Sequence, residues 1–331
     1  MFNLGSILAF ATLALATSRT SAPSGALVVG SSGKYSTIQK AVNALSSTST
    51  SAQSIFIEAG TYNEQVTISS LKGALTIYGY TADTSSYAGN KVTITAAHAL
   101  ANEATDDATG TLRVETKNFK MYNVNVKNTY GSAASSGQAL ALSANAGNQG
   151  YFGCGFYGFQ DTILAETGAQ VYGRCYIEGA TDFIFGQSAL AWFDACDIRV
   201  LKASLGYITA SGRASDTTSY YVINNSTIAA ASGNTVPTGA FYLGRPWDNY
   251  ARVAFQMTTM SAVVNTAGWS KWSSASPLTD HVSFGEYDNS GTGSKGTRAS
   301  FASKLSKAVP ITEILGSSYE SLSFVDTGYL S

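Results

Sequence analysis

The sequence predicts an all-β fold in which short parallel strands stack as the coils of a solenoid. Three observations predict it. Side chains of one kind recur every 21 residues in the middle of the chain, short segments alternate apolar and polar side chains, and only 12% of residues are charged. With 331 residues, the chain is long enough to bury a large core.

The repeat is clearest at Cys154, Cys175 and Cys196. Neighbouring parallel strands lie about 4.8 Å apart, so residues one repeat apart should be direct neighbours. Four further sets share the spacing: Tyr151, Tyr172 and Phe193; Phe156, Ile177 and Ile198; Ile163, Ile184 and Leu205; Gly158 and Gly179.

Short alternating segments, such as residues 75–78, 119–126 and 220–223, should be strands of these coils. In a solenoid, each coil pairs its backbone with the coils before and after it, and the inward side chains form a continuous core. We therefore expect little helix.

One helix is expected near the start. Residues 36–39 resemble a capping box, and apolar residues then recur at helical spacing at Ile38, Ala41, Val42 and Leu45. This helix should cap the first coil, which would otherwise leave backbone groups unpaired. After Gly285 we expect a tail on the outside of the solenoid, with a second weak helix at 300–305.

Residues 1–22 are expected to be a signal peptide, because an apolar run at 4–16 precedes small residues. The run is too short to span a bilayer, and the alternative is a buried segment. Residues 23–331 would then form one secreted, extracellular domain with no membrane attachment. Two overlapping patterns make Asn224 and Asn225 candidates for glycosylation.

Composition excludes other classes. The net charge of −1 argues against a nucleic-acid partner. There is no Cys-x-x-Cys motif or histidine cluster, so we expect no metal site. The three cysteines should be buried free thiols, with a disulfide between adjacent rungs as the alternative. A monomer is expected, because no heptad or spare apolar stripe is present.

Asp161 and Asp182 lie on the same 21-residue repeat, so stacking should bring their carboxyl groups together. Like charges at close range raise one pKa, which would leave one carboxyl protonated and one ionised near neutral pH. Such a pair can supply both an acid and a nucleophile. The structural alternative is that both aspartates only stabilise turns.

The flanking segments favour a site. Apolar side chains surround both aspartates, in residues 158–162 and 179–186, and carboxylates among them would be costly unless paired. Residues 242–247 add Arg245, whose planar fork suits a carboxylate, and Trp247, whose face could stack on a sugar.

These segments, together with residues 33–39, 60–64 and 137–142, resemble pectin methylesterases along most of the chain. The resemblance, which is to the fungal type, implies a right-handed, single-stranded parallel β-helix like that of pectin lyase. It implies hydrolysis of methyl-esterified homogalacturonan, the polysaccharide of pectin, to pectate and methanol, with no metal or organic cofactor.

By the same resemblance, Asp182 is the nucleophile that forms an acyl-enzyme, and Asp161 is the general acid and base. Gln138 and Gln160 would stabilise the oxyanion. Arg245 would orient Asp182 and contact substrate, as would Trp247 and Phe185. Leu164 departs from the family, which often has Tyr there.

Other reactions fit less well. There is no Gly-x-Ser-x-Gly elbow, and the two histidines, His98 and His281, are given no role. A polygalacturonase would need its acids further apart, and a calcium-dependent lyase would need a denser acidic cluster. A solenoid that only binds carbohydrate is the non-enzymatic alternative.

Overall fold

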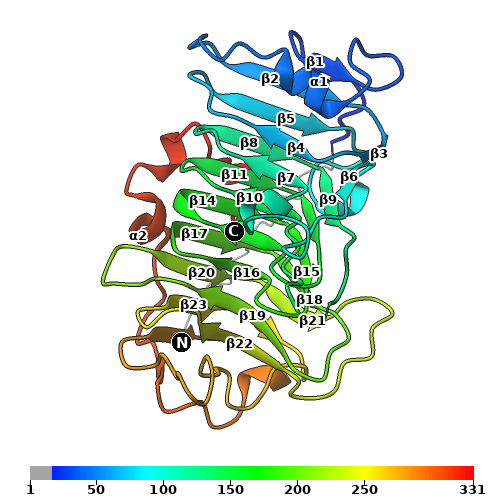
Figure 1. Cartoon of the computed structure of the whole chain (residues 1–331). Coiled ribbons are helices and arrows are strands. Elements are labelled where there is room, and N and C mark those ends of the chain that lie inside the picture. Colours follow the sequence, from blue (N-terminus) through cyan, green and yellow to red (C-terminus); the bar gives the residue numbers. More distant parts are fainter. Residues whose placement is uncertain (1–16, 134) are drawn as a thin grey trace, which may run out of the picture.

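The chain is a parallel β-helix, as predicted (Figure 1). The structure is a computed structural model and describes residues 17–133 and 135–331. Within these residues, the strands form three parallel sheets of 11, 7 and 8 strands, which run the length of the stack. Successive strands of one coil belong to different sheets, so each sheet pairs a coil with the next one. Helix is confined to short pieces.

Sheet one consists of β1 (Leu27–Val29), β2 (Gln53–Ile57), β5 (Leu75–Gly79), β8 (Phe119–Tyr122), β11 (Gln149–Phe152), β14 (Thr167–Gly173), β17 (Ser188–Asp194), β20 (Tyr220–Asn224), β23 (Arg252–Gln256), β25 (Ser283–Tyr287) and β26 (Ala302–Lys304). Sheet two consists of β4 (Val66–Ile68), β7 (Leu112–Val114), β10 (Leu142–Ala144), β13 (Ile163–Ala165), β16 (Ile184–Gly186), β19 (Gly206–Ser211) and β22 (Phe241–Pro246). Sheet three consists of β3 (Gly60–Asn63), β6 (Val92–Ala96), β9 (Asn125–Asn128), β12 (Gly155–Tyr157), β15 (Tyr176–Gly179), β18 (Asp197–Val200), β21 (Thr227–Ala230) and β24 (Thr259–Met260). The helices are α1 (Ile38–Asn43) and α2 (Ile311–Leu315).

The 21-residue repeat corresponds to strand register. Tyr151 pairs with Tyr172, and Tyr172 with Phe193. Their rings stack inside the core, with centroids 5.0 and 4.4 Å apart. Such stacked aromatic pairs add to the free energy of burial.

One rung of the predicted ladders is wrong. Ile184 pairs with Thr209, whereas Leu205 is 52% exposed. The coil between β16 and β19 contains an extra loop, so residues beyond it leave the 21-residue phase.

A column of left-handed residues turns the chain from sheet one to sheet three. A single residue with positive φ follows each of seven successive sheet-one strands, which makes the corner sharp in every coil. The residues are Asn123, Gly153, Arg174, Ala195, Asn225, Met257 and Asp288. The repeat thus preserves backbone conformation as well as side-chain type.

The first coil is capped by α1, as expected, although the helix begins one residue later than the capping box suggested. Thr37 is the N-cap and accepts a hydrogen bond from the Lys40 amide. Glu64 accepts the amides of Ile38 and Gln39 at 2.8 and 3.0 Å. The Gln39 side chain bonds both backbone groups of Thr67 in β4, an edge strand of sheet two, and so replaces a missing strand.

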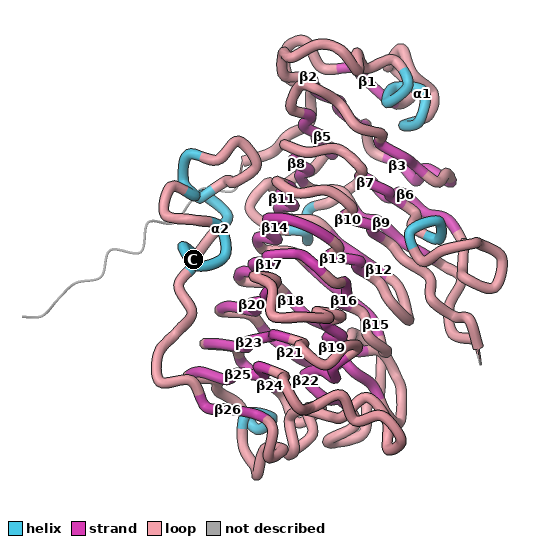
Figure 2. The backbone as a smooth tube through the Cα atoms, turned by 60° about the vertical axis from the view of Figure 1, so that its left-hand side comes forward, coloured by secondary structure: helices cyan, strands magenta, loops and turns pink. Residues whose placement is uncertain are grey.

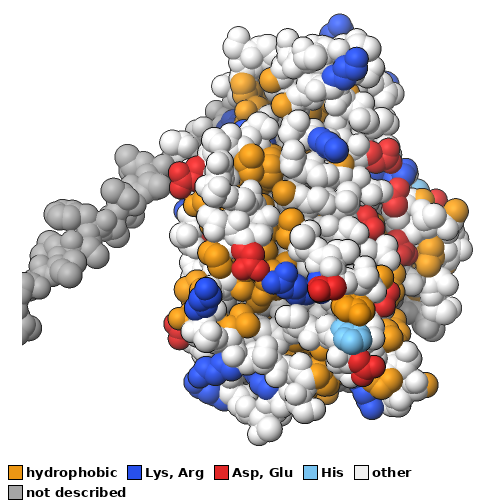
Figure 3. Space-filling model, turned by 90° about the vertical axis from the view of Figure 1, so that its left-hand side faces the viewer, with side chains coloured by type: hydrophobic (Ala, Val, Ile, Leu, Met, Phe, Trp, Pro, Cys, Tyr) orange, Lys and Arg blue, Asp and Glu red, His pale blue; other side chains and the backbone are white. Residues whose placement is uncertain are grey.

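The C-terminal tail runs alongside the stack (Figure 2). The expected helix at 300–305 is wrong, because those residues include β26, which extends sheet one. The helix α2 follows it and covers the outer face of sheet one. There Ile314, Leu315 and Phe324 pack against residues such as Trp192 and Val222. Charged side chains on this side of the molecule are scattered rather than gathered (Figure 3).

Cys154, Cys175 and Cys196 are free thiols with at most 1% exposure. We expect native protein to be inert to a thiol reagent and to release three equivalents of signal after unfolding in denaturant. Detection of only one equivalent after unfolding without reductant would contradict this assignment, because two cysteines would then form a disulfide.

Candidate active site

All seven residues predicted to act on substrate line one hollow on the outside of sheet two, with a volume of about 260 Å³. The coils rise along this hollow in order, from the segment before β7 to the end of β22. Its lining residues are Asp106, Gln138, Gln160, Asp161, Asp182, Phe185, Ala210, Arg245, Trp247 and Trp272.

The floor of the hollow consists of side chains that are paired neighbours on adjacent strands of sheet two. Leu164 pairs with Phe185, and Phe185 with Ala210, which in turn pairs with Arg245. The first three form a small apolar cluster that Trp247 covers. Leu164, the departure from the family pattern, therefore lies in this apolar floor and is only 6% exposed.

Asp161 and Asp182 occupy equivalent corners of adjacent coils. Both have left-handed backbones, with φ of 62° and 50°, and the Asp161 amide donates to the Thr181 carbonyl at 3.0 Å. Aspartate tolerates this conformation better than most residues do, although it is strained. Each residue is at most 7% exposed. The predicted stacking thus places two buried carboxyl groups in one hollow.

Arg245 binds Asp182 through two parallel hydrogen bonds. The distances are 2.9 Å from Nε to Oδ1 and 2.6 Å from Nη2 to Oδ2. The arginine reaches from β22 over β19, where the small side chain of Ala210 leaves room. The rings of Tyr207 and Trp272 lie 4.1 and 4.2 Å from its guanidinium carbon and fix its plane. This geometry favours an ionised Asp182.

The two aspartates differ in electrostatics. Burial raises the pKa of Asp161 well above its usual value, and the carboxylates of Asp182 and Asp106 raise it further. Burial also raises the pKa of Asp182, but the hydrogen bonds and charge of Arg245 act against this effect. The proton shared by the pair therefore resides on Asp161.

Several polar atoms in the hollow have no partner. Among the described residues, six buried side-chain polar atoms lack a hydrogen bond, and three belong to this lining: Asp106 Oδ1, Gln138 Oε1 and Asp161 Oδ1. Buried polar groups are normally paired. A site that binds a polar substrate would explain this concentration.

Four lining or supporting residues were not predicted, among them Ala210 on β19. Asp106 comes from the loop before β7, and Trp272 follows β24. Tyr207 on β19 holds Arg245 but does not line the hollow. None belongs to a repeat or a motif, so only the folded chain brings them here.

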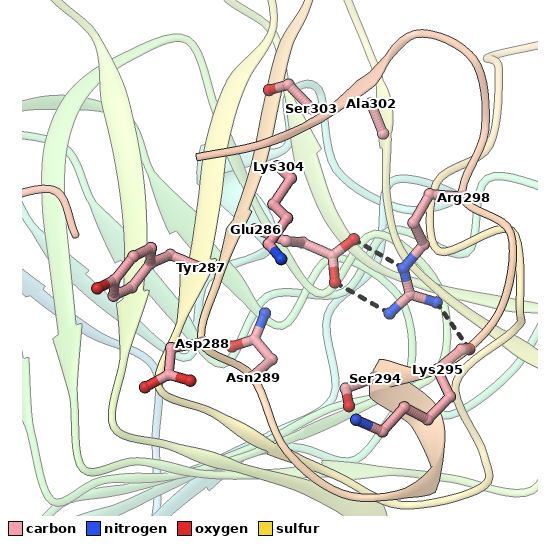
Figure 4. A pocket seen from close by; sticks show the side chains of 10 residues that line it. All are labelled: Glu286, Tyr287, Asp288, Asn289, Ser294, Lys295, Arg298, Ala302, Ser303 and Lys304. Carbon is pink, nitrogen blue, oxygen red and sulfur yellow. Dashed lines mark hydrogen bonds and ion pairs between the residues drawn. The ribbon is translucent and has the colours of Figure 1, made fainter. Parts of the chain in front are cut away.

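Larger hollows elsewhere in the described chain lack this combination of buried carboxyl groups and unpartnered polar atoms. One of about 650 Å³ lies at β25 and β26 (Figure 4), where Glu286 and Arg298 pair through two hydrogen bonds of 2.9 Å. None of the unpartnered atoms found in the described chain lines it. Size alone does not identify the site.

One glycosylation candidate is wrong. Asn224 is 5% exposed and its side chain bonds Asp194 and Gln256, so it cannot carry a glycan in the folded protein. Asn225 is exposed at the adjacent corner.

Two further expectations concern metal and membrane. In residues 17–133 and 135–331, no group of three or more His, Cys, Asp or Glu side chains is arranged to hold a metal ion. Over the same residues, no helix is both long and apolar enough to cross a bilayer. The expected signal peptide falls mostly on residues 1–16, outside the described chain.

Known proteins resemble the chain over its full length. The family model described as Pectinesterase matches residues 26–310. A pectinesterase of Aspergillus niger is 55% identical over 99% of this chain and 98% of its own length. One from Aspergillus aculeatus is 56% identical over 97% of each chain.

Solved structures agree. A crystal structure of pectin methylesterase from Aspergillus niger is 43% identical and superimposes with a TM-score of 0.87, covering 95% of this chain and all of that one (100%). Pectin methylesterase from carrot is 27% identical with a TM-score of 0.81, over 92% of this chain and 98% of its own.

Proposed function

The chain belongs to the pectinesterase family, and from this premise we propose that its hollow converts methyl-esterified homogalacturonan to pectate and methanol through a covalent intermediate on Asp182. Family membership makes it a hydrolase of pectin methyl esters, of the fungal type. The observation that carries the mechanism is the pairing of Arg245 with Asp182 in the hollow that also holds Asp161, a carboxyl group whose pKa is raised by burial.

In the first half-reaction, an Asp182 oxygen attacks the carbonyl carbon of the galacturonate methyl ester. The side-chain amides of Gln138 and Gln160 donate to the oxyanion that forms. Neither amide nitrogen has an acceptor among the described residues, which leaves both available. The carbon–oxygen bond to methanol then breaks, and Asp161 gives its proton to the departing oxygen. An anhydride between Asp182 and the galacturonyl group remains.

In the second half-reaction, water attacks the galacturonyl carbon of the anhydride and Asp161 accepts its proton. The bond to Asp182 breaks and the carboxylate returns to Arg245. The sum is one ester and one water converted to one acid and one methanol. Asp161 thus acts as an acid in the first half-reaction and as a base in the second, as is usual in two-carboxylate enzymes.

Aromatic side chains would position the sugar. Trp247 is half-buried at the edge of the hollow, with its ring centroid 6.0 Å from that of Phe185. Phe185 is only 3% exposed, so it would contact the reacting unit from the floor, whereas Trp247 offers a face to a neighbouring unit. The proposal uses no metal or organic cofactor.

We also propose that the protein is secreted as a monomer, with any N-linked glycan on Asn225. Arg19 belongs to the folded domain, since its backbone pairs with Thr81 and its guanidinium donates to Asn123. We therefore propose that cleavage of a leader falls before Arg19 rather than at about residue 22.

One incubation with highly methylated pectin tests the function. We expect methanol without shortening of the polymer. Shortened chains would indicate a glycosidase, unsaturated ends a lyase, and no change a binding protein. Methanol release that required added calcium would contradict the proposed chemistry.

Replacing Gln160 with alanine should lower kcat about 10²- to 10³-fold and leave KM nearly unchanged, because the lost hydrogen bond forms only to the oxyanion. Steady-state kinetics on methylated pectin measure this split. The matched control is Gln53→Ala, which removes an amide bonded to Ser46 at the far end of the stack. A Gln160→Ala variant with normal kcat would exclude Gln160 from the oxyanion site.

A further inference from the structure

We infer that Asp106 determines substrate specificity: its carboxylate lies at one end of the hollow and disfavours an ionised galacturonate next to the ester that is cleaved. The protein would thus act best where neighbouring units are esterified. This inference rests on the proposed function, because it concerns how the same site binds pectin.

The loop that carries Asp106 is held in place by the residues that follow it. Asp107 binds Arg113 and Ser143, and Gln65 donates to the carbonyls of Ala108 and Gly110. The backbone carbonyl of Asp106 itself accepts the Thr109 amide at 2.9 Å. The position of the loop is therefore fixed without help from the Asp106 side chain.

The fold makes no use of the Asp106 carboxyl group. It makes no capping hydrogen bond to the short helix that follows it, and its buried Oδ1 has no partner in the described chain. The group lines the same hollow as Gln138, Gln160 and Asp161. A buried acceptor that faces a binding site and is unused by the fold is available to a ligand.

Charge in the hollow is unbalanced. Its lining contains three carboxyl groups and one cation, Arg245, which is already bound to Asp182. The nearby Arg113 is paired with Asp107 and Glu115. The charge of Asp106 also reaches Asp161 and Glu166, whose pKa values it helps to raise. No unpaired cation among the lining residues described here neutralises Asp106.

Asp106 lies at one end of the site. It precedes β7, whereas Asp161 precedes β13 and Asp182 precedes β16. Two strand spacings of about 4.8 Å therefore separate the level of Asp106 from that of Asp161, and three separate it from that of Asp182. A polymer in the hollow would place a neighbouring sugar over this end. An esterified unit is neutral and can donate a hydroxyl to Oδ1, whereas an ionised unit is repelled.

The expected effect is moderate. Two unit charges about 7 Å apart in an effective dielectric constant of about 40 change binding roughly five- to tenfold. We therefore expect Asp106→Asn to lower, by roughly five- to tenfold, the ratio of kcat/KM on highly esterified pectin to that on sparsely esterified pectin. Methanol release gives both values, and it is measured at neutral pH or above, because burial raises the pKa of Asp106 and both carboxyl groups must be ionised.

Salt provides a second readout. Added salt should reduce this ratio for the unmodified protein, because screening weakens the repulsion, and should barely affect it for Asp106→Asn. Glu103→Gln is the matched control, since Glu103 is in the same loop but pairs with His98 outside the hollow. Its ratio should match that of the unmodified protein. Asp106→Ser replaces Asp106→Asn if thermal unfolding shows that the latter is misfolded.

The outcomes separate the two proposals. If the unmodified protein releases methanol and Asp106→Asn leaves the ratio unchanged, the inference is overturned. An equal change of kcat/KM on both pectins would then mean that Asp106 acts only through Asp161. If the unmodified protein releases no methanol from either pectin, the proposed function itself fails.

Discussion

Asp182→Asn should lose methanol release by a factor on the order of 10⁴ or more, because an amide cannot form the anhydride. The fold should persist, since asparagine has the same shape and the left-handed corner tolerates it. Loss of the charge leaves Arg245 without its partner, so a modest decrease in Tm is expected. Kinetics and thermal unfolding on one preparation measure both effects.

The matched control for this variant is Asp197→Asn. Asp197 is also paired with an arginine, Arg199, at 2.7 Å, but on β18 and outside the hollow. It should keep normal turnover. Normal methanol release by Asp182→Asn would refute Asp182 as the nucleophile.

Asp161→Asn should lower kcat by about 10²- to 10⁴-fold, the usual contribution of a general acid and base. Methanol would then leave without a proton donor, and water would attack the anhydride without a base. A loss in kcat below about threefold would contradict this role.

The same variant should be more stable than the unmodified protein at neutral pH. The pKa of Asp161 is raised in the folded state, so the folded protein holds a proton that the unfolded chain releases. The stability that Asp161 contributes is present below the unfolded pKa, about 3.9, and is lost as pH rises through the folded value. Asparagine does not titrate. The gain in Tm of Asp161→Asn over the unmodified protein should therefore be near zero at about pH 4 and should increase as the pH rises. A gain that is constant with pH would show that Asp161 is not a buried titrating group.

Most of the architecture could be predicted because residues one repeat apart in the sequence are neighbours on adjacent coils. Tyr172 and Phe193 are one coil apart and also stack in space. The same relation places Asp161 and Asp182 in adjacent corners, with no long-range information needed.

Predictions from the sequence failed where the 21-residue period is interrupted, and where the surroundings of a residue in the fold override its local sequence pattern. Leu205 lies in an extra loop, which periodicity cannot anticipate. Residues 300–305 have a weakly helical pattern, but the open edge of β25 pairs with β26. Asn224 fits a glycosylation pattern, yet hydrogen bonds to Asp194 and Gln256 bury it.

Some site residues could not have been found from sequence. Asp106 and Trp272 sit in irregular loops without a repeat partner, and only the path of the chain brings them to the hollow. The role of Ala210 is that of a small residue over which Arg245 extends, a requirement that no local pattern expresses.

Acid-quenched mass spectrometry during turnover of a methylated oligogalacturonide tests the central claim most directly. Trypsin cleaves after Lys127, Arg174 and Arg199, so Asp161 and Asp182 fall on different peptides, 128–174 and 175–199. We predict that peptide 175–199 gains the mass of the oligosaccharide less methanol, on Asp182. Label on peptide 128–174, or no label on either peptide while methanol is released, would contradict the account.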